Sequence, residues 1–154
     1  MEKIEEHKKF LELAYKEAVK AKKKGEVPIG AVIVKDGKVI SKGHNLRITK
    51  KNPLYHAEIV AIEKASKKLG AWRLDDCVLY TTLEPCLMCA GAIMQSRIKK
   101  VIFCVNDDKG GAVISNVKAF DINFPFNVEY QYIPLEKSKD LLKSFFKSLR
   151  DKTT

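Results

Sequence analysis

The sequence has no long apolar run and only four cysteines among its 154 residues. No stretch approaches the roughly 18 consecutive apolar residues that a membrane-spanning helix needs, so we expect no membrane span. The first ten residues are charged and contain no apolar signal core, so we expect a protein that is not exported. Four cysteines in such a chain do not indicate a disulfide framework.

Acidic residues are in the minority. The chain has 29 Lys and Arg against 19 Asp and Glu, a formal net charge of +10. Of the basic residues 25 are Lys, whose point charge suits phosphate better than bidentate base recognition. The excess is concentrated in residues 1–24, 42–51, 97–100 and 137–152. Two interpretations stay open: a solvated lysine-rich surface, or a surface that binds a polyanion such as nucleic acid.

The hydrophobic pattern predicts one domain over residues 1–154, without repeats or linkers. Helical spacing predicts four helices, at residues 10–21, 56–69, 85–97 and 135–150. Short apolar and β-branched runs predict five strands, at residues 29–34, 39–40, 77–82, 100–105 and 128–133. Residues 42–55 are expected to form a polar loop. With one further helix in the last crossover, this order predicts an α/β protein, a three-layer α/β/α sandwich around a five-stranded mixed sheet.

Two short motifs carry the chemistry, and each begins a predicted helix. They are His56-Ala57-Glu58 and Pro85-Cys86-Leu87-Met88-Cys89. Cys86 and Cys89 are three residues apart, so on a helix both thiols face one side, and a helix N-terminus favours thiolates. With His56 they provide three protein ligands, the pattern of a catalytic zinc site with a fourth position open to water.

Glu58 lies too close to His56 in sequence to be an obvious fourth ligand. At a helix start it can reach over a zinc-bound water and act as a general acid and base. The pattern His-x-Glu…Pro-Cys-x-x-Cys is already known as the signature of zinc nucleobase deaminases, and this chain matches it. The residues therefore predict hydrolytic deamination of a ring carbon that carries an amine.

Other roles for the cysteines and histidines are possible. Cys-x-x-Cys also occurs as a redox pair, but that leaves His-Ala-Glu unexplained. A structural zinc would need a fourth ligand, and the candidates Cys77 and Cys104 lie in apolar strand runs, where we expect small buried side chains. His7 is expected to face solvent. His44 and its neighbour Asn45 are each expected to contact substrate or cap a loop.

The chain resembles bacterial tRNA adenosine deaminases over nearly its full length. These enzymes convert the wobble adenosine of an anticodon to inosine. The matching segments are Glu26–Ala31, Gly43–Asn45, His56–Ile59, Thr82–Ala92, Ser96–Ile98 and Phe145–Lys147. The zinc motif is common to nucleobase deaminases, whereas the TLEPCxMCAGA…SRI pattern is more particular to the tRNA-acting branch.

The resemblance implies a cytidine deaminase-like fold and one Zn²⁺ per subunit, held by His56, Cys86 and Cys89. It implies that Glu58 is the catalytic proton shuttle. The substrate contacts implied are Asn45, Val27, Pro28, Ala57, Pro85, Asp107 and Lys109. The implied partners are a tRNA anticodon loop and a second copy in a homodimer, with no membrane and no DNA, in the cytoplasm.

Three features depart from that family. Residues 125–128 stand where it carries an Asn-His pair, and residues 106–111 match its loop imperfectly. Residues 69–77 resemble guanine deaminases of the same fold. A free-base deaminase acting on guanine or cytosine is therefore an alternative. A non-catalytic RNA-binding module with a structural zinc is another, but it gives Glu58 no role.

Aromatic residues lie near the basic segments. Phe145 and Phe146 share an amphipathic pattern with Leu142 and Leu149, so we expect them in the core. Consecutive helix positions point about 100° apart, so exposure of one of the two stays open. Phe124 and Phe126 flank a proline in a predicted loop and are the better candidates for exposed surfaces on which bases stack.

Overall fold

The computed structural model describes residues 2–123 and 125–153. In chain order the elements are α1 (Glu2–Lys23), β1 (Gly30–Lys35), β2 (Lys38–His44), α2 (Ala57–Leu69), β3 (Cys77–Thr81), α3 (Leu87–Gln95), β4 (Lys100–Phe103), the short 3₁₀ helix η1 (Ala119–Asp121), β5 (Glu129–Tyr132) and α4 (Glu136–Thr153). The prediction for Phe124 lies outside the described residues. None of the described helices combines the length and apolarity needed to cross a bilayer.

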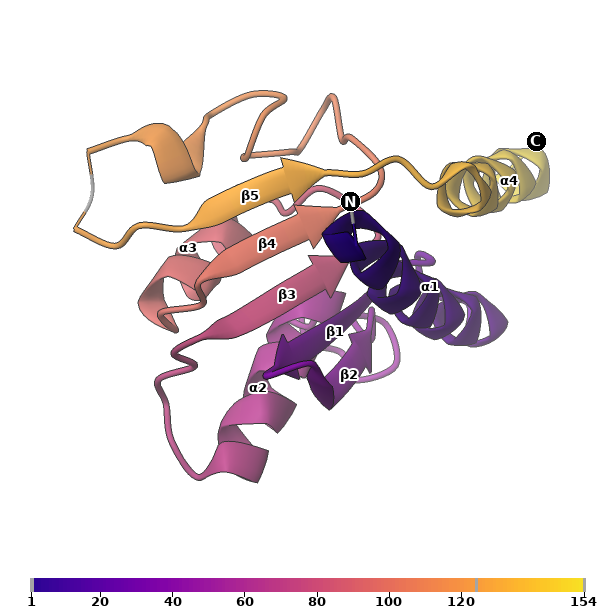
Figure 1. Ribbon diagram of the computed structural model, residues 1–154. Coiled ribbons are helices and arrows are strands. Elements are labelled where there is room, and N and C mark those ends of the chain that lie inside the picture. The colour runs from indigo at the N-terminus through magenta and orange to yellow at the C-terminus, as the bar shows by residue number, and fades with distance from the viewer. Residues whose placement is uncertain (1, 124, 154) are drawn as a thin grey trace.

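The five strands form one mixed sheet in the order β2-β1-β3-β4-β5 (Figure 1). β1 runs antiparallel to both β2 and β3, whereas β3, β4 and β5 are parallel. Asp36 and Gly37 connect β1 to β2 with φ angles of 52° and 76°, as a tight hairpin turn requires. The predicted α/β sandwich with a five-stranded mixed sheet is confirmed.

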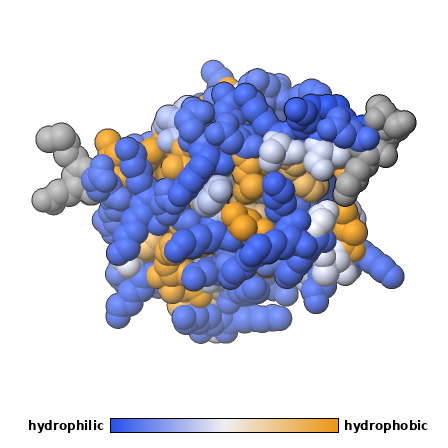
Figure 2. All heavy atoms as spheres, turned by 90° about the vertical axis from the view of Figure 1, so that its right-hand side faces the viewer, coloured by the Kyte–Doolittle hydropathy of each residue, from blue (hydrophilic) through white to orange (hydrophobic). Residues whose placement is uncertain are grey.

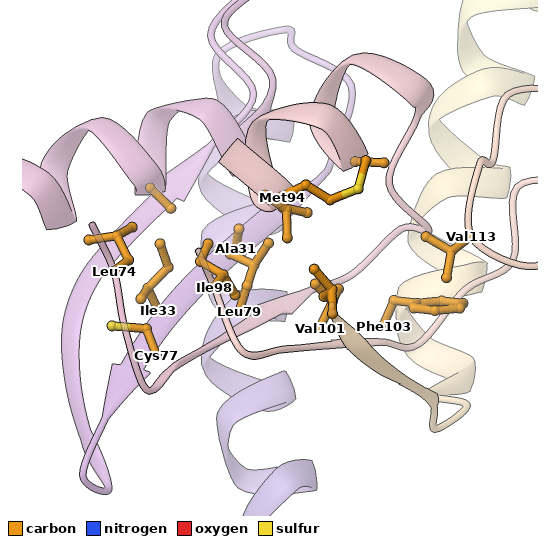
Figure 3. Close-up of a cluster of buried hydrophobic side chains, with 14 of the residues drawn as sticks. Ala31, Ile33, Leu74, Cys77, Leu79, Met94, Ile98, Val101, Phe103 and Val113 are labelled. Atoms are coloured by element: carbon orange, nitrogen blue, oxygen red, sulfur yellow. The ribbon is translucent and has the colours of Figure 1, made fainter. Parts of the chain in front are cut away.

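Side chains that alternate along the strands divide the core between the two faces of the sheet. Ala31 and Ile33 of β1 point to the side of α2 and α3, where Figure 3 shows them with Leu79, Val101 and other apolar side chains. On the other face, Val32 and Val34 pack with Phe10 and Leu11 of α1 and Leu142 of α4. Burial of each such large side chain contributes roughly 1.5–3 kcal/mol.

Several predicted boundaries are corrected. β2 continues to His44, so the segment predicted as a polar loop begins later. Gly43 belongs to this strand because it packs closely on α2, where an added Cβ would lie 2.8 Å from the Ala57 carbonyl oxygen. α3 begins at Leu87 instead of Pro85, and the last crossover contains only the three-residue η1 where a helix was expected.

The apolar stripe of α4 is only partly buried, and one of its two adjacent phenylalanines is exposed. Leu142 is buried and Phe145 is half-buried, but Phe146 is 42% exposed and Leu149 is 50% exposed. α4 lies beyond the carboxyl ends of β4 and β5, so the sheet does not cover its later turns (Figure 1). Its amphipathic pattern was real, but amphipathicity does not say what covers the apolar face.

Candidate metal centre

The first turns of α2 and α3 bring the two sequence motifs together. His56 is the N-cap residue of α2 and Cys86 is the N-cap residue of α3. Both have extended backbone angles, and neither side chain caps its own helix, so the imidazole and the thiol are available as ligands. Cys89 follows in the first turn of α3, where the helix dipole favours a thiolate.

The three ligand atoms lie within 4.8 Å of one another. His56 Nδ1 is 3.6 Å from Cys86 Sγ and 3.5 Å from Cys89 Sγ. Zinc bonds to nitrogen at about 2.0–2.1 Å and to sulfur at about 2.3 Å, so tetrahedral ligands of these types lie about 3.6 Å apart. One imidazole and two thiols at this spacing fit Zn²⁺ and provide three of its four ligands.

The electrostatics of the cluster favour negative charge on one of the two sulfurs, that of Cys86. The hydrogen bond from the Cys89 thiol lowers the pKa of Cys86 to about 4, and His56 acts in the same direction. The same bond to Cys86 raises the pKa of Cys89, and burial adds to this effect. The His56 imidazole has a raised pKa, mainly because of its hydrogen bond with Cys86.

Glu58 is buried in the first turn of α2, with 4% of its surface exposed. Burial raises the pKa of its carboxyl to about 7, and a hydrogen bond with Cys89 acts in the opposite direction. The carboxyl therefore lies beside the ligand cluster without being part of it. A carboxyl with a pKa near neutrality can both accept and return a proton.

The predicted substrate contacts fall into two hollows. Val27 and Asn45 line a cavity of about 430 Å³. The buried Asn45 side chain accepts a hydrogen bond from the Arg47 backbone at 3.1 Å, so it also caps the following loop. Asp107 and Lys109 line a second hollow, of about 860 Å³, between their loop and α4.

The remaining predicted contacts are buried. Pro28, Ala57 and Pro85 all lie below the surface. Ala57 begins α2 between His56 and Glu58, and Pro85 directly precedes Cys86. Their role as substrate contacts stays a prediction.

Besides Glu17, the sequence did not reveal two further buried carboxylates, Glu26 and Glu84. Glu26 accepts hydrogen bonds from the backbone of Ile48 at 3.1 Å and of Thr49 at 2.6 Å, which holds the loop after Asn45. Glu84 binds the loop that carries Asp107. Both residues stand in the segments matched to the deaminase family, but their partners are more than 20 residues away and no local pattern reveals them.

Several expectations about single residues are settled by the packing. Cys77 and Cys104 are buried, as expected, and in the described part of the chain neither joins the ligand cluster. The expectation for His7 is wrong, because it is half-buried and lies 2.7 Å from the Tyr80 hydroxyl. His44 binds Glu17 at 3.0 Å, which fixes the end of β2 to α1.

Phe126 is not the exposed stacking surface that its loop position suggested. It is half-buried against the core cluster beneath α2 and α3. The Arg97 guanidinium lies 3.7 Å from the centre of its ring. Because this cation covers one face of the ring, that face cannot stack on a base.

A three-layer sandwich with an imidazole, two thiols and a buried carboxyl at two helix starts defines a zinc-dependent deaminase. The sequence profile of the MafB19-like deaminases matches residues 5–150. The tRNA-specific adenosine deaminase of Aquifex aeolicus (strain VF5) is 48% identical over 143 residues, which cover 92% of this chain and 95% of that protein. Its counterpart in Bacillus subtilis (strain 168) is 44% identical over 146 residues, 93% of this chain and 90% of that protein.

Solved structures agree with this assignment. A structure from studies of A-to-I editing by tRNA:A34 deaminases at the wobble position of transfer RNA has a TM-score of 0.84 and 40% identity, and covers 88% of this chain and 99% of that one. The guanine deaminase of Bacillus subtilis has a TM-score of 0.64 and 35% identity, with 92% and 94% covered. The chain belongs to the MafB19-like deaminases and to the family of tRNA-specific adenosine deaminases.

Proposed function

We propose that the protein converts adenosine to inosine at the wobble position of a tRNA anticodon loop. The single observation that carries this proposal is the ligand cluster of His56, Cys86 and Cys89 with the buried carboxyl of Glu58 beside it. Relatives that are 44–48% identical over nearly the whole chain are tRNA-specific adenosine deaminases, which supports the substrate.

The reaction is a hydrolysis in which water adds to C6 of adenine, the C6–N6 bond breaks and ammonia leaves. His56, Cys86 and Cys89 would hold Zn²⁺, which would lower the pKa of a bound water toward neutrality. The Glu58 carboxylate accepts a proton from the attacking water and transfers it to the amine nitrogen that leaves. Burial of Glu58 keeps bulk water from competing for that proton.

The pocket for the base is proposed to lie beside Asn45 and Val27, which line one cavity. The hydrogen bond from Arg47 fixes the Asn45 carboxamide, so its orientation toward a base is set before binding. Pro28, Ala57 and Pro85 are also proposed to shape the pocket. Because all three side chains are buried, we propose that they do so through their backbone atoms. An unpaired anticodon loop loses little stacking when one of its bases enters such a pocket.

The RNA backbone is proposed to lie along the hollow between the Asp107–Lys109 loop and α4. The lining includes four cationic side chains of α4, at Lys139, Lys143, Lys147 and Arg150. Figure 2 shows the side of the molecule that carries α4, and it is mainly hydrophilic with separate apolar patches. Clustered cations of this kind bind phosphates through counterion release.

A homodimer that acts in the cytoplasm completes the proposal. Leu54 and Leu87 lie just before α2 and at the start of α3 and are 53% and 59% exposed. Apolar side chains exposed this close to a catalytic centre support a second copy as the covering surface. Light scattering at micromolar concentration tests this, and a mass of one subunit would contradict it.

A free guanine deaminase is the second candidate, and one observation favours it. The structure of a guanine deaminase is 35% identical to this chain over 92% of its length. The two functions separate in one assay with a deaminable tRNA, free guanine and free cytosine as substrates. We expect inosine in the tRNA; activity on a free base without activity on any RNA would overturn the proposal.

A further inference from the structure

Glu84 is a buried carboxylate directly before the metal-ligand segment Pro85-Cys86. Only 2% of its surface is exposed. Its backbone N–H donates to the Val105 carbonyl oxygen at 2.8 Å, which places it where β3 and β4 end. No step of the proposed reaction uses this carboxylate, so its burial needs another explanation.

Five donors converge on the two oxygens of Glu84. Oε1 accepts the backbone N–H of Asp107 at 3.0 Å and the Ser115 hydroxyl at 2.5 Å. Oε2 accepts the backbone N–H groups of Val113, Ile114 and Ser115 at 3.0, 2.8 and 2.9 Å. Hydrogen bonds to a carboxylate are stronger than neutral ones. One side chain therefore binds both ends of the loop over residues 107–115.

The same loop lies against the metal-ligand segment. Gly111 forms a β-bridge with Cys86, and the Ala112 N–H donates to the Pro85 carbonyl oxygen at 2.9 Å. A Cβ added at Gly111 would lie 2.3 Å from Cδ of Glu84, so only glycine fits there. The loop, the carboxylate and the ligand segment therefore form one packed unit.

This loop carries the side chains that are proposed to contact RNA. Asp107 Oδ1 accepts the backbone N–H groups of Lys109 and Gly110 at 3.3 and 3.1 Å, which shapes the turn itself. The turn lines the hollow beside α4. Where Asp107 and Lys109 stand therefore depends on the bonds that Glu84 makes.

We propose that Glu84 is a positioning residue that fixes the 107–115 loop on the metal-ligand segment and so sets the affinity for the RNA substrate. This inference rests on the proposed function. A glutamine at this position keeps the size, but its NH₂ group faces N–H donors and leaves them unsatisfied. The loop then loosens, whereas His56, Cys86 and Cys89 keep their places in the two helix starts.

The test compares Glu84→Gln and Ser115→Ala with the unaltered protein, using an anticodon stem-loop RNA. Ser41→Ala is the control, because it removes a hydroxyl that bonds the Ala61 carbonyl oxygen at 2.8 Å, away from this loop. We expect KM to rise about tenfold in Glu84→Gln and about two- to fivefold in Ser115→Ala, with kcat within about twofold and full zinc content. Ser41→Ala keeps the unaltered KM.

An unaltered KM in Glu84→Gln, or a fall in kcat together with loss of zinc, would overturn the inference while the proposed function stands. If Glu84→Gln does not fold, Ser115→Ala decides: a raised KM at unchanged melting temperature supports the inference, and an unaltered KM refutes it. An unaltered protein that does not deaminate the RNA refutes the proposed function itself, and the inference with it.

Discussion

Replacing Glu58 by glutamine tests the proposed chemistry most directly. The amide has nearly the same volume as the carboxyl but cannot accept a proton, so the fold and the three ligands remain. General acid–base catalysis contributes about 10²–10⁴-fold in rate, or about 2.7–5.5 kcal/mol of barrier. Because Glu58 is only 4% exposed, bulk water has little access to the position of its carboxyl, and we expect a loss in the upper half of that range.

Single-turnover formation of inosine in an anticodon stem-loop measures this loss, with zinc content determined on the same samples. Glu63→Gln is the matched control, since Glu63 lies on the same helix and its side chain is exposed and pairs with Lys67 at 3.5 Å. It should keep full activity. A Glu58→Gln protein with bound zinc and a rate within about threefold of the unaltered protein would refute the reasoning.

Three further predictions concern binding, metal and acid. Lys143→Ala combined with Lys147→Ala should weaken RNA binding and reduce the slope of log affinity against log salt by about 1.4, measured by titration at several salt concentrations; an unchanged slope contradicts the α4 contact. Cys86→Ser should lower the zinc-to-protein ratio and abolish deamination, and full zinc content by metal analysis would count against it. Hydrogen bonds outweigh burial and hold the pKa values of Glu17 and Glu26 below the usual 4.5. The stabilisation that these two ionised carboxylates give the fold is therefore complete above about pH 4.5. It is lost as the pH falls through their lower pKa values in the folded protein, so the free energy of unfolding should decline there. A free energy of unfolding that does not change with pH in this range would refute the prediction.

Much of the site could be predicted because its signals are local. His56 and Cys86 precede apolar helical runs, so their places at helix starts follow from the sequence, and the spacing of Cys86 and Cys89 sets their common side. The strand runs were also visible, because apolar side chains buried on both sheet faces leave nearly continuous β-branched segments. These patterns were enough to predict the sheet and the metal ligands.

The features of the site that could not be predicted from the sequence depend on contacts between distant segments. Glu84 bonds to Ser115, 31 residues away, and Glu26 bonds to Thr49, 23 residues away. A carboxylate that will be buried by such partners cannot be distinguished in sequence from one that faces solvent. Phe146 shows a different limit: its helix has the expected periodicity, but the side chain is 42% exposed, because periodicity does not say what covers an apolar face.

The placement of the zinc ligands at helix caps has a consequence for metal uptake. Separations of 3.5 and 3.6 Å between the imidazole nitrogen and the two sulfurs already approach those of a tetrahedral complex. The sandwich that sets them is built from two extensive apolar cores. In a zinc finger the ion replaces most of the core, whereas this fold buries two apolar cores of its own, so chelation should remove the metal without unfolding the chain.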